Sequence, residues 1–312
     1  MKSAVRNNEP LQRSTLNAQY RQLDVGRSPR RSQSKAEAGL DARHGGARPS
    51  RRRVGRSPRR SPSKSEAGWA LSVFLSMKRK HQRPFVVATF AMTVDGKITT
   101  RKLSPVDFTS REDKLHLFRQ RALADGVLVG HTTLKRDNVR LGIPPELCEE
   151  RLKRGQTPAP IRVIISNKGK IDNQLKIFQS DPAKAGPILI FSTARMPKRI
   201  RTALQKKAVL QLSKSQHVDL DKMLRILRSE YGVRTVACEG GPTLFRSLLE
   251  RGLVDQLNLT IAPYLFGGTG APTLTGLSKK FLPASVRCSL VEMHVTGNEC
   301  FLTYKIKQKT KS

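Results

Sequence analysis

Apolar and polar positions between residues 84 and 308 follow two periods that alternate along the chain. Short apolar runs, such as FVVATFA at 85–91, VLV at 127–129 and IRVII at 161–165, are typical of buried strands. The segments between such runs repeat apolar residues at the spacing of an amphipathic helix, as at 219–231. This alternation predicts an α/β fold with a mainly parallel sheet and helices on both of its faces.

The C-terminal part of the chain has a different pattern. Residues 254–262 (VDQLNLTIA) alternate between apolar and polar positions, which predicts a half-buried strand. Two further strand-like stretches, 286–295 and 300–306, flank a turn sequence at 296–299 (TGNE). They predict an antiparallel hairpin that closes the sheet.

The stretch 233–249 joins a predicted strand to a predicted helix through Glu239-Gly240-Gly241-Pro242. Two glycines allow backbone N–H groups to approach an anion, and a helix N-terminus adds partial positive charge. Pro242 suits the first helical turn, and Thr243 is expected to cap it. Glu239 would lie at the carboxyl end of its strand, where open α/β sheets bind ligands. A tight turn without a ligand explains the glycine pair equally well.

Three other strand ends carry groups that can bond a phosphate. The stretch TVDGK at 93–97 offers a hydroxyl, a carboxylate and a lysine, although a plain hairpin turn accounts for it too. The stretch GHTT at 130–133 offers a glycine and hydroxyls where a helix begins, with His131 more typical of a structural than a catalytic residue. The stretch SNKGK at 166–170 places two lysines near a strand end, where they suit an extra phosphate or remain solvated.

A helix predicted at 111–124 begins after Ser110, which is a suitable N-cap. Its residue Arg121 lies four positions before Asp125, so these two side chains could simply pair along the helix.

Composition adds charge to this picture. The 312 residues include 59 Lys and Arg against 24 Asp and Glu, a net charge of +35, which favours anionic partners such as phosphates or nucleic acid.

Residues 1–83 are dense in Arg and Ser and too poor in hydrophobic residues for a core, so we expect a disordered tail before a folded domain at 84–308. The element VGRSPRRS occurs twice in this tail, at 25–32 and 54–61. The tail could bind nucleic acid weakly and without specificity through this element. Alternatively, the whole tail could act as an organelle-targeting leader or be only solvated.

Cysteine usage and hydropathy argue against a disulfide-bonded, a metal-binding and a membrane-spanning protein. The four cysteines form no CxxC and have no histidine at zinc-ligand spacing, so we expect reduced thiols in a cytoplasmic protein and no metal site. No apolar run reaches the length of about 18 residues that a membrane span needs.

Several motifs follow one another in an order that resembles the riboflavin-biosynthesis reductase family. This family includes the C-terminal reductase domain of bifunctional deaminase-reductases and the stand-alone diaminopyrimidine reductases. The resemblance covers nearly all of the predicted folded domain. The motifs that carry it are Thr93-Val94-Asp95-Gly96-Lys97, Arg121 with Asp125, Val129-Gly130-His131-Thr132-Thr133, Asp137-Asn138, Glu239-Gly240-Gly241-Pro242-Thr243-Leu244, Ala262-Pro263 and Gly267-Gly268.

The resemblance implies a dihydrofolate-reductase-like fold, NADPH as cofactor, a homodimer, and reduction of a ribosylamino-pyrimidine 5′-phosphate to its ribityl form. Hydride transfer to the ribose C1′ needs positioning and charge stabilisation more than a nucleophile. Substrate contacts are implied for Arg121, Leu141 and Glu239, with Arg121 suited to the phosphate. The proton donor is left open between Glu239, Asp95 and a water. Cofactor contacts are implied for Thr93, Gly130, Thr133, Asp137, Ser166, Gly240, Gly241, Pro242, Thr243, Leu244 and Phe245.

Three positions depart from the family pattern. Thr89 stands where a lysine is frequent, Val139 replaces a proline, and Pro144 replaces an arginine that bifunctional members often carry. These changes leave the substrate open, so an enzyme of the same fold acting on another substrate is one alternative. The other is a basic nucleic-acid-binding protein in which the folded domain is a relic.

Overall fold

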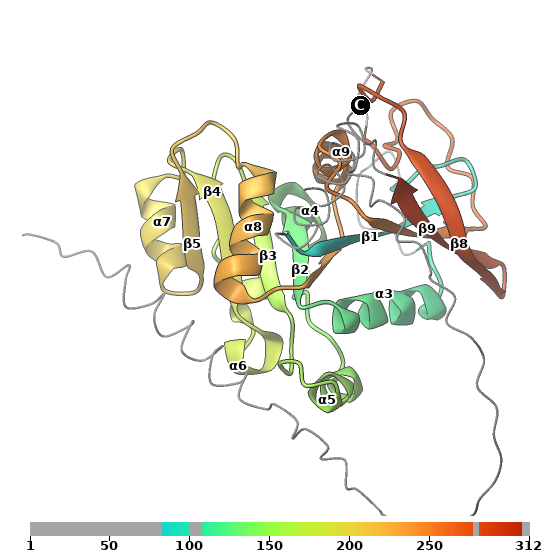
Figure 1. The fold of residues 1–312 in the computed structure, drawn as a ribbon. Helices are drawn as coiled ribbons and strands as arrows, with labels where there is room; N and C mark the ends of the chain where they lie inside the picture. Colours follow the sequence, from blue (N-terminus) through green and yellow to red (C-terminus); the bar gives the residue numbers. More distant parts are fainter. Residues whose placement is uncertain (1–82, 100–107, 277–280, 308–312) are drawn as a thin grey trace, which may run out of the picture.

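The computed structural model describes residues 83–99, 108–276 and 281–307 (Figure 1). The predicted tail therefore lies outside the described residues, apart from Arg83, and its disorder stays a prediction. Arg83 forms a bidentate ion pair with Asp255, with Nη1–Oδ2 and Nη2–Oδ1 distances of 2.7 and 2.9 Å. Asp255 also accepts a hydrogen bond from the backbone N–H of Val86, so this pair holds the start of the first strand.

A nine-stranded sheet organises the described residues, in the order β5-β4-β3-β2-β6-β1-β7-β9-β8. All strands from β5 to β7 in this order run parallel, whereas β9 is antiparallel to both β7 and β8. The predicted fold class, a mainly parallel sheet with a C-terminal antiparallel hairpin, is confirmed. The strands are β1 (Phe85–Thr93), β2 (Gly126–Gly130), β3 (Ile161–Ser166), β4 (Ile188–Thr193), β5 (Val209–Ser213), β6 (Thr235–Cys238), β7 (Gln256–Ala262), β8 (Arg287–Thr296) and β9 (Glu299–Lys307).

Helices cover both faces of the sheet, as predicted (Figure 1). One core contains the apolar sides of α8 and α9, for example Leu224 and Leu248. A second core contains Leu134 of α4 and Leu204 of α7. The helices are α3 (Arg111–Leu123), α4 (His131–Asp137), α5 (Pro145–Lys153), α6 (Pro182–Ala185), α7 (Lys198–Gln205), α8 (Leu220–Tyr231) and α9 (Pro242–Glu250), with the 3₁₀ turn η1 (Lys176–Gln179).

Capping residues set the ends of the helices that the sequence predicted best. The Ser110 side chain accepts a hydrogen bond from the backbone N–H of Asp113 at the start of α3. Asp219 caps α8 in the same way, and Gly232 ends that helix in the left-handed conformation, with φ of 67°. The predicted capping role of Thr243 is wrong, because the N-cap of α9 is Gly241 and makes no side-chain cap.

The parallel arrangement brings the carboxyl ends of the central strands to one edge. Ala88 of β1 and Leu128 of β2 both pair with Cys238 of β6, and Gly130 pairs with Ile165 of β3. The residues that follow these positions therefore meet at the same edge, where α/β sheets bind their ligands.

Among the described residues, no helix is long and apolar enough to cross a membrane. The same residues contain no group of three or more His, Cys, Asp or Glu that could hold a metal ion. The four cysteines are free thiols. Burial raises the pKa of Cys238 to about 12, so this thiol is not a nucleophile at neutral pH.

Candidate active site

A buried ion pair between Arg121 and Glu239 lies at the carboxyl edge of the sheet. Arg121 donates from Nε and Nη2 to the two carboxylate oxygens of Glu239, at 2.5 and 2.8 Å, and from Nη1 to the carbonyl oxygen of Gly142 at 2.9 Å. The two side chains are only 8% and 10% exposed. Burial disfavours the charge on Arg121, but the attraction to Glu239 and the hydrogen bond with it raise the pKa of Arg121 overall. The pair is thus a fixed charged group at a ligand-binding edge.

The local pairing of Arg121 with Asp125 that the sequence allowed does not occur. Asp125 instead accepts hydrogen bonds from the backbone N–H groups of Arg234 and Thr235, at 2.8 and 3.0 Å, and so anchors the start of β6. Arg121 reaches Glu239 because α3 packs against β1 and β6. Its guanidinium also lies 5.3 Å from the ring centroid of Phe118, a cation–π contact within the same helix.

The glycine turn after β6 packs closely against the start of α4. The backbone N–H of Gly130 donates to the carbonyl oxygen of Gly240 at 2.6 Å. A Cβ atom at Gly241 would lie 2.3 Å from Oγ1 of Thr133, and one at Gly240 would lie 2.9 Å from the ring of Phe90. Gly240 also has a φ of +89°, which side chains rarely allow. The turn therefore requires glycine at both positions.

This turn fits the phosphate groups of a dinucleotide cofactor. Gly241 makes no side-chain cap, so no capping side chain competes for the N–H groups in the first turn of α9. A helix N-terminus with such groups is an anion site, and the missing Cβ atoms allow close approach. Thr133, whose hydroxyl lies against Gly241, and Pro242 to Phe245 in the first turn of α9 are the predicted cofactor residues that the structure brings together here.

The predicted residues of the first turn after β1 are held by one another. The Thr93 hydroxyl donates to Oδ1 of Asp95 and accepts from the backbone N–H of Lys97 at 2.9 Å. Asp95 also accepts from the N–H groups of Phe266 and Gly267, at 3.2 and 2.7 Å. The Thr93 hydrogen bond is the largest cause that lowers the pKa of Asp95, and the two N–H groups add to it. Asp95 thus organises the glycine-rich loop after β7.

Three further predicted residues lie at the end of α4, at the end of β3 and in the loop after α4. Desolvation is the main effect that raises the pKa of Asp137, the last residue of α4; Glu239 adds to the rise and Arg136 opposes it. Ser166 ends β3, and its Oγ accepts from the N–H of Gly169 at 3.1 Å. Leu141 is 2% exposed and packs into the second core, so only its backbone, with φ of 57°, remains for a ligand.

Thr89 of β1, which the sequence marked only as a departure from the family pattern, and Asn258 of β7, which it did not single out, are paired buried polar residues. Thr89 follows Ala88, the partner of Cys238, so it lies next to Glu239 across the strands, and it pairs with Asn258 of β7. Both residues are buried, and Oγ1 of Thr89 and Nδ2 of Asn258 have no hydrogen-bond partner among the described residues. The alternating pattern of β7 predicted a half-buried strand, but it gave no indication that its polar side would be covered.

Replacing Thr89 with valine is expected to raise the free energy of unfolding by about 1 kcal/mol, because an unpaired buried hydroxyl is removed at nearly constant shape. Thr193→Val is the matched control. Thr193 is equally buried, but its hydroxyl donates to the carbonyl of Asn167 at 2.8 Å. That variant should lose about 1 kcal/mol. Urea denaturation of the full chain measures both changes, and a Thr89→Val loss equal to the Thr193→Val loss would contradict the assignment.

Comparison with known proteins places these features in a family. The model of the RibD C-terminal domain matches residues 84–302. The 2,5-diamino-6-ribosylamino-4(3H)-pyrimidinone 5′-phosphate reductase of Archaeoglobus fulgidus is 30% identical over 193 residues, covering 62% of this chain and 86% of that protein. The reductase of the same name from Methanothermobacter thermautotrophicus is 28% identical over 226 residues, covering 72% of this chain and 99% of that protein.

Solved structures agree on the fold. A pyrimidine reductase-like protein from Corynebacterium diphtheriae superposes with a TM-score of 0.63 at 23% identity, covering 74% of this chain and 94% of that one. The family match spans the sheet from β1 into β9 and therefore includes the Arg121–Glu239 pair and the glycine turn. The chain belongs to the RibD C-terminal domain family.

Proposed function

We propose that this protein is an NADPH-dependent reductase of riboflavin biosynthesis. It would reduce the ribosyl group of a ribosylamino-pyrimidine 5′-phosphate to ribityl by hydride transfer to C1′. The observation that carries this proposal is the buried Arg121–Glu239 pair next to an uncapped, glycine-lined helix N-terminus. Relatives named for this reaction support the substrate class.

The chain's own residues divide into two groups in this proposal. The turn at 240–245, with Gly130, Thr133, Asp137 and Ser166, would hold the cofactor, which supplies the hydride when bound. Lys168 and Lys170 follow β3, are exposed, and would suit the additional phosphate of NADPH.

The second group would bind and orient the substrate. Arg121 would contact the substrate phosphate through the N–H groups that do not bond Glu239 or Gly142. Glu239 would orient the sugar and stabilise the charge that develops as C1′ is reduced. The proton donor stays open between Glu239, which accepts from Arg121, Asp95, which accepts from Thr93, and a water.

The test is NADPH oxidation by the purified full-length chain, followed at 340 nm. The diaminopyrimidinone ribosylamino phosphate and its deaminated uracil counterpart are offered in parallel, with NADH as a second cofactor. Turnover of either substrate with NADPH is the expected result and fixes whether reduction precedes deamination. If the chain binds NADPH but turns over neither substrate, the proposed substrate is contradicted, and a same-fold reductase of another compound is favoured.

We also propose that the chain forms a homodimer through β8. This edge strand exposes Leu290, Val291, Met293 and Val295 by 54% or more. A long apolar edge strand of this kind is normally covered, and a second copy of β8 provides the same apolar surface. Sedimentation velocity should give a dimer that becomes monomeric in Val291→Lys/Val295→Lys. Glu292→Lys, a charge change on the same strand, should stay dimeric, and a monomeric wild-type chain would contradict this proposal.

Two predictions, nucleic-acid binding and cellular location, depend on the tail at 1–83, of which the structure describes only Arg83. Weak nucleic-acid binding by residues 1–83 stays a prediction, which steep salt dependence and loss on deletion of this segment would support. A cytoplasmic location is likewise proposed. A fluorescent fusion of the full chain, compared with one lacking residues 1–83, tests it against organelle targeting.

A further inference from the structure

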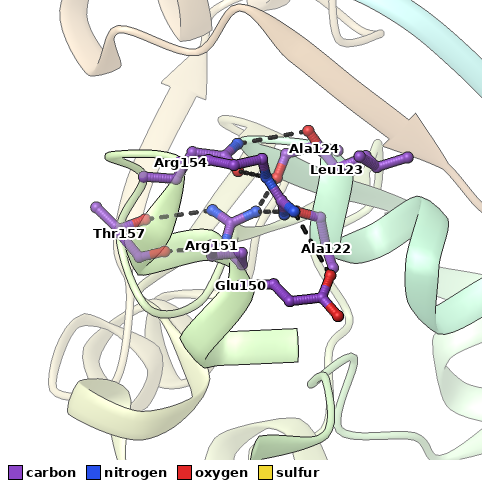
Figure 2. A network of polar contacts seen from close by, with 8 residues as sticks. Ala122, Leu123, Ala124, Glu150, Arg151, Arg154 and Thr157 are labelled. Carbon is purple, nitrogen blue, oxygen red and sulfur yellow. Dashed lines mark hydrogen bonds and ion pairs between the residues drawn. The ribbon is translucent and has the colours of Figure 1, made fainter. Parts of the chain in front are cut away.

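A second buried arginine, Arg151 of α5, is fully enclosed and bonds the end of the helix that carries Arg121. Figure 2 shows its contacts. Its Nη1 donates to the carbonyl oxygens of Ala122 and Ala124, at 2.8 and 2.5 Å. Its Nε donates to the carbonyl oxygen of Thr157 at 2.8 Å, and Nη2 lies 3.4 Å from the Thr157 hydroxyl. One guanidinium therefore ties the helix α5 and the loop after it to the segment at 122–124.

The acceptors Ala122 and Ala124 lie at the C-terminal end of α3. The last carbonyl groups of a helix lack partners within the helix and carry partial negative charge, so a buried cation there is doubly favourable. Arg154, one turn further along α5, adds a bond from Nη2 to the carbonyl of Ala122 at 2.9 Å, as Figure 2 shows. The residue that precedes Ala122 is Arg121. Arg151 and Arg154 thus hold the carbonyl group of Ala122, the residue next to Arg121 in the chain.

We propose that Arg151 is a positioning residue for the Arg121–Glu239 pair. The planar guanidinium of Arg151 bonds the carbonyls of Ala122 and Ala124 at the end of α3 and, at the same time, the carbonyl of Thr157 in the loop after α5. The ammonium group of lysine cannot make these bonds in the same geometry. Without these bonds, the last turn of α3 is free to shift, and Arg121 must follow it. Displacements of about 1 Å at a distance from the reacting atoms can lower activity about 100-fold.

The first test is structural and does not depend on the proposed function. In a crystal structure of Arg151→Met, we expect the Arg121–Glu239 pair to be disrupted, with the Nε–Oε1 distance increased from 2.5 Å by about 1 Å or more. Arg162→Met is the matched control. Arg162 is also fully buried, and within the described part of the chain it bonds only backbone carbonyls, those of Arg140, Ile177 and Gly186, none of them in α3. A pair that is intact in Arg151→Met, or equally broken in both variants, overturns the proposal.

The second test is kinetic and rests on the proposed reductase function. Arg151→Met should lower kcat/KM for the pyrimidine substrate by about 100-fold. Arg121→Met should lower it as well, and the double variant should be no worse than Arg121→Met alone, because Arg151 acts through Arg121. The dissociation constant for NADPH should change less than about 2-fold. Additive losses, or an equal loss of NADPH affinity, overturn the positioning role.

Two further outcomes keep the proposals separate. If the wild-type chain turns over neither substrate, the proposed function fails and the crystallographic test alone decides the role of Arg151. If Arg151→Met does not fold, Arg151→Lys replaces it in both tests. That variant keeps the charge and should give an intermediate loss in kcat/KM with a lengthened Arg121–Glu239 pair, whereas wild-type kinetics with an unchanged pair overturn the proposal.

Discussion

Replacing Glu239 with glutamine is expected to lower kcat/KM of the proposed reaction by about 1,000-fold, because the substitution removes the negative charge and the proton-transfer capacity of this position. The same change weakens a bidentate buried ion pair with Arg121 and should lower the free energy of unfolding by roughly 2 kcal/mol. Steady-state NADPH oxidation and urea denaturation of the full chain measure the two effects. Affinity for NADPH should persist, since the turn at 240–245 is unchanged.

Asp255→Asn provides the control for this prediction. Asp255 pairs with Arg83 through the same bidentate geometry, with side chains exposed by 13% and 11%. It lies at the amino end of β1, because it accepts from the N–H of Val86. We expect a stability loss similar to that of Glu239→Gln, with kcat/KM within about 2-fold of wild type. Equal kinetic losses in the two variants would contradict a chemical role for Glu239.

Replacing Gly241 with alanine is expected to weaken NADPH binding about 30-fold, which corresponds to about 2 kcal/mol. The added Cβ would lie 2.3 Å from Oγ1 of Thr133. Thr133 is β-branched and on a helix, so its side chain cannot easily rotate away, and the turn must move. That movement displaces the N–H groups that would face the cofactor phosphates. The overpacking should also lower the free energy of unfolding by about 1–3 kcal/mol.

Gly270→Ala is the control for this second prediction. A Cβ at Gly270 meets nothing within 4 Å, and its φ lies outside the range that L side chains rarely adopt. It should bind NADPH like the wild-type chain and unfold at the same urea concentration. Isothermal titration with NADPH measures all three proteins. Wild-type affinity in Gly241→Ala would show that this turn does not hold the cofactor.

Local patterns in the sequence predicted the elements well for a simple physical reason. Whether a segment forms a strand or a helix depends on its own apolar period, and its ends depend on residues a few positions away. Ser110 therefore marked a true helix start, and the helix predicted at 219–231 is observed at 220–231. The glycine turn was visible because two glycines stand between a strand pattern and a helix pattern, although the contacts with Thr133 and Phe90 that require them are tertiary.

Tertiary structure alone decided how the charged side chains pair. Arg121 had a local partner available in Asp125, yet it bonds Glu239, 118 positions away. The order β2-β6-β1 creates that contact, and sheet order is not encoded in any local period. The burial of Thr89 and the hydrogen bonds of Arg151 were hidden likewise, because tertiary contacts between distant groups leave no pattern along the chain. The sequence by itself thus determined the elements, the glycine turn and the family resemblance, whereas packing across the sheet decided which charges meet at the candidate site.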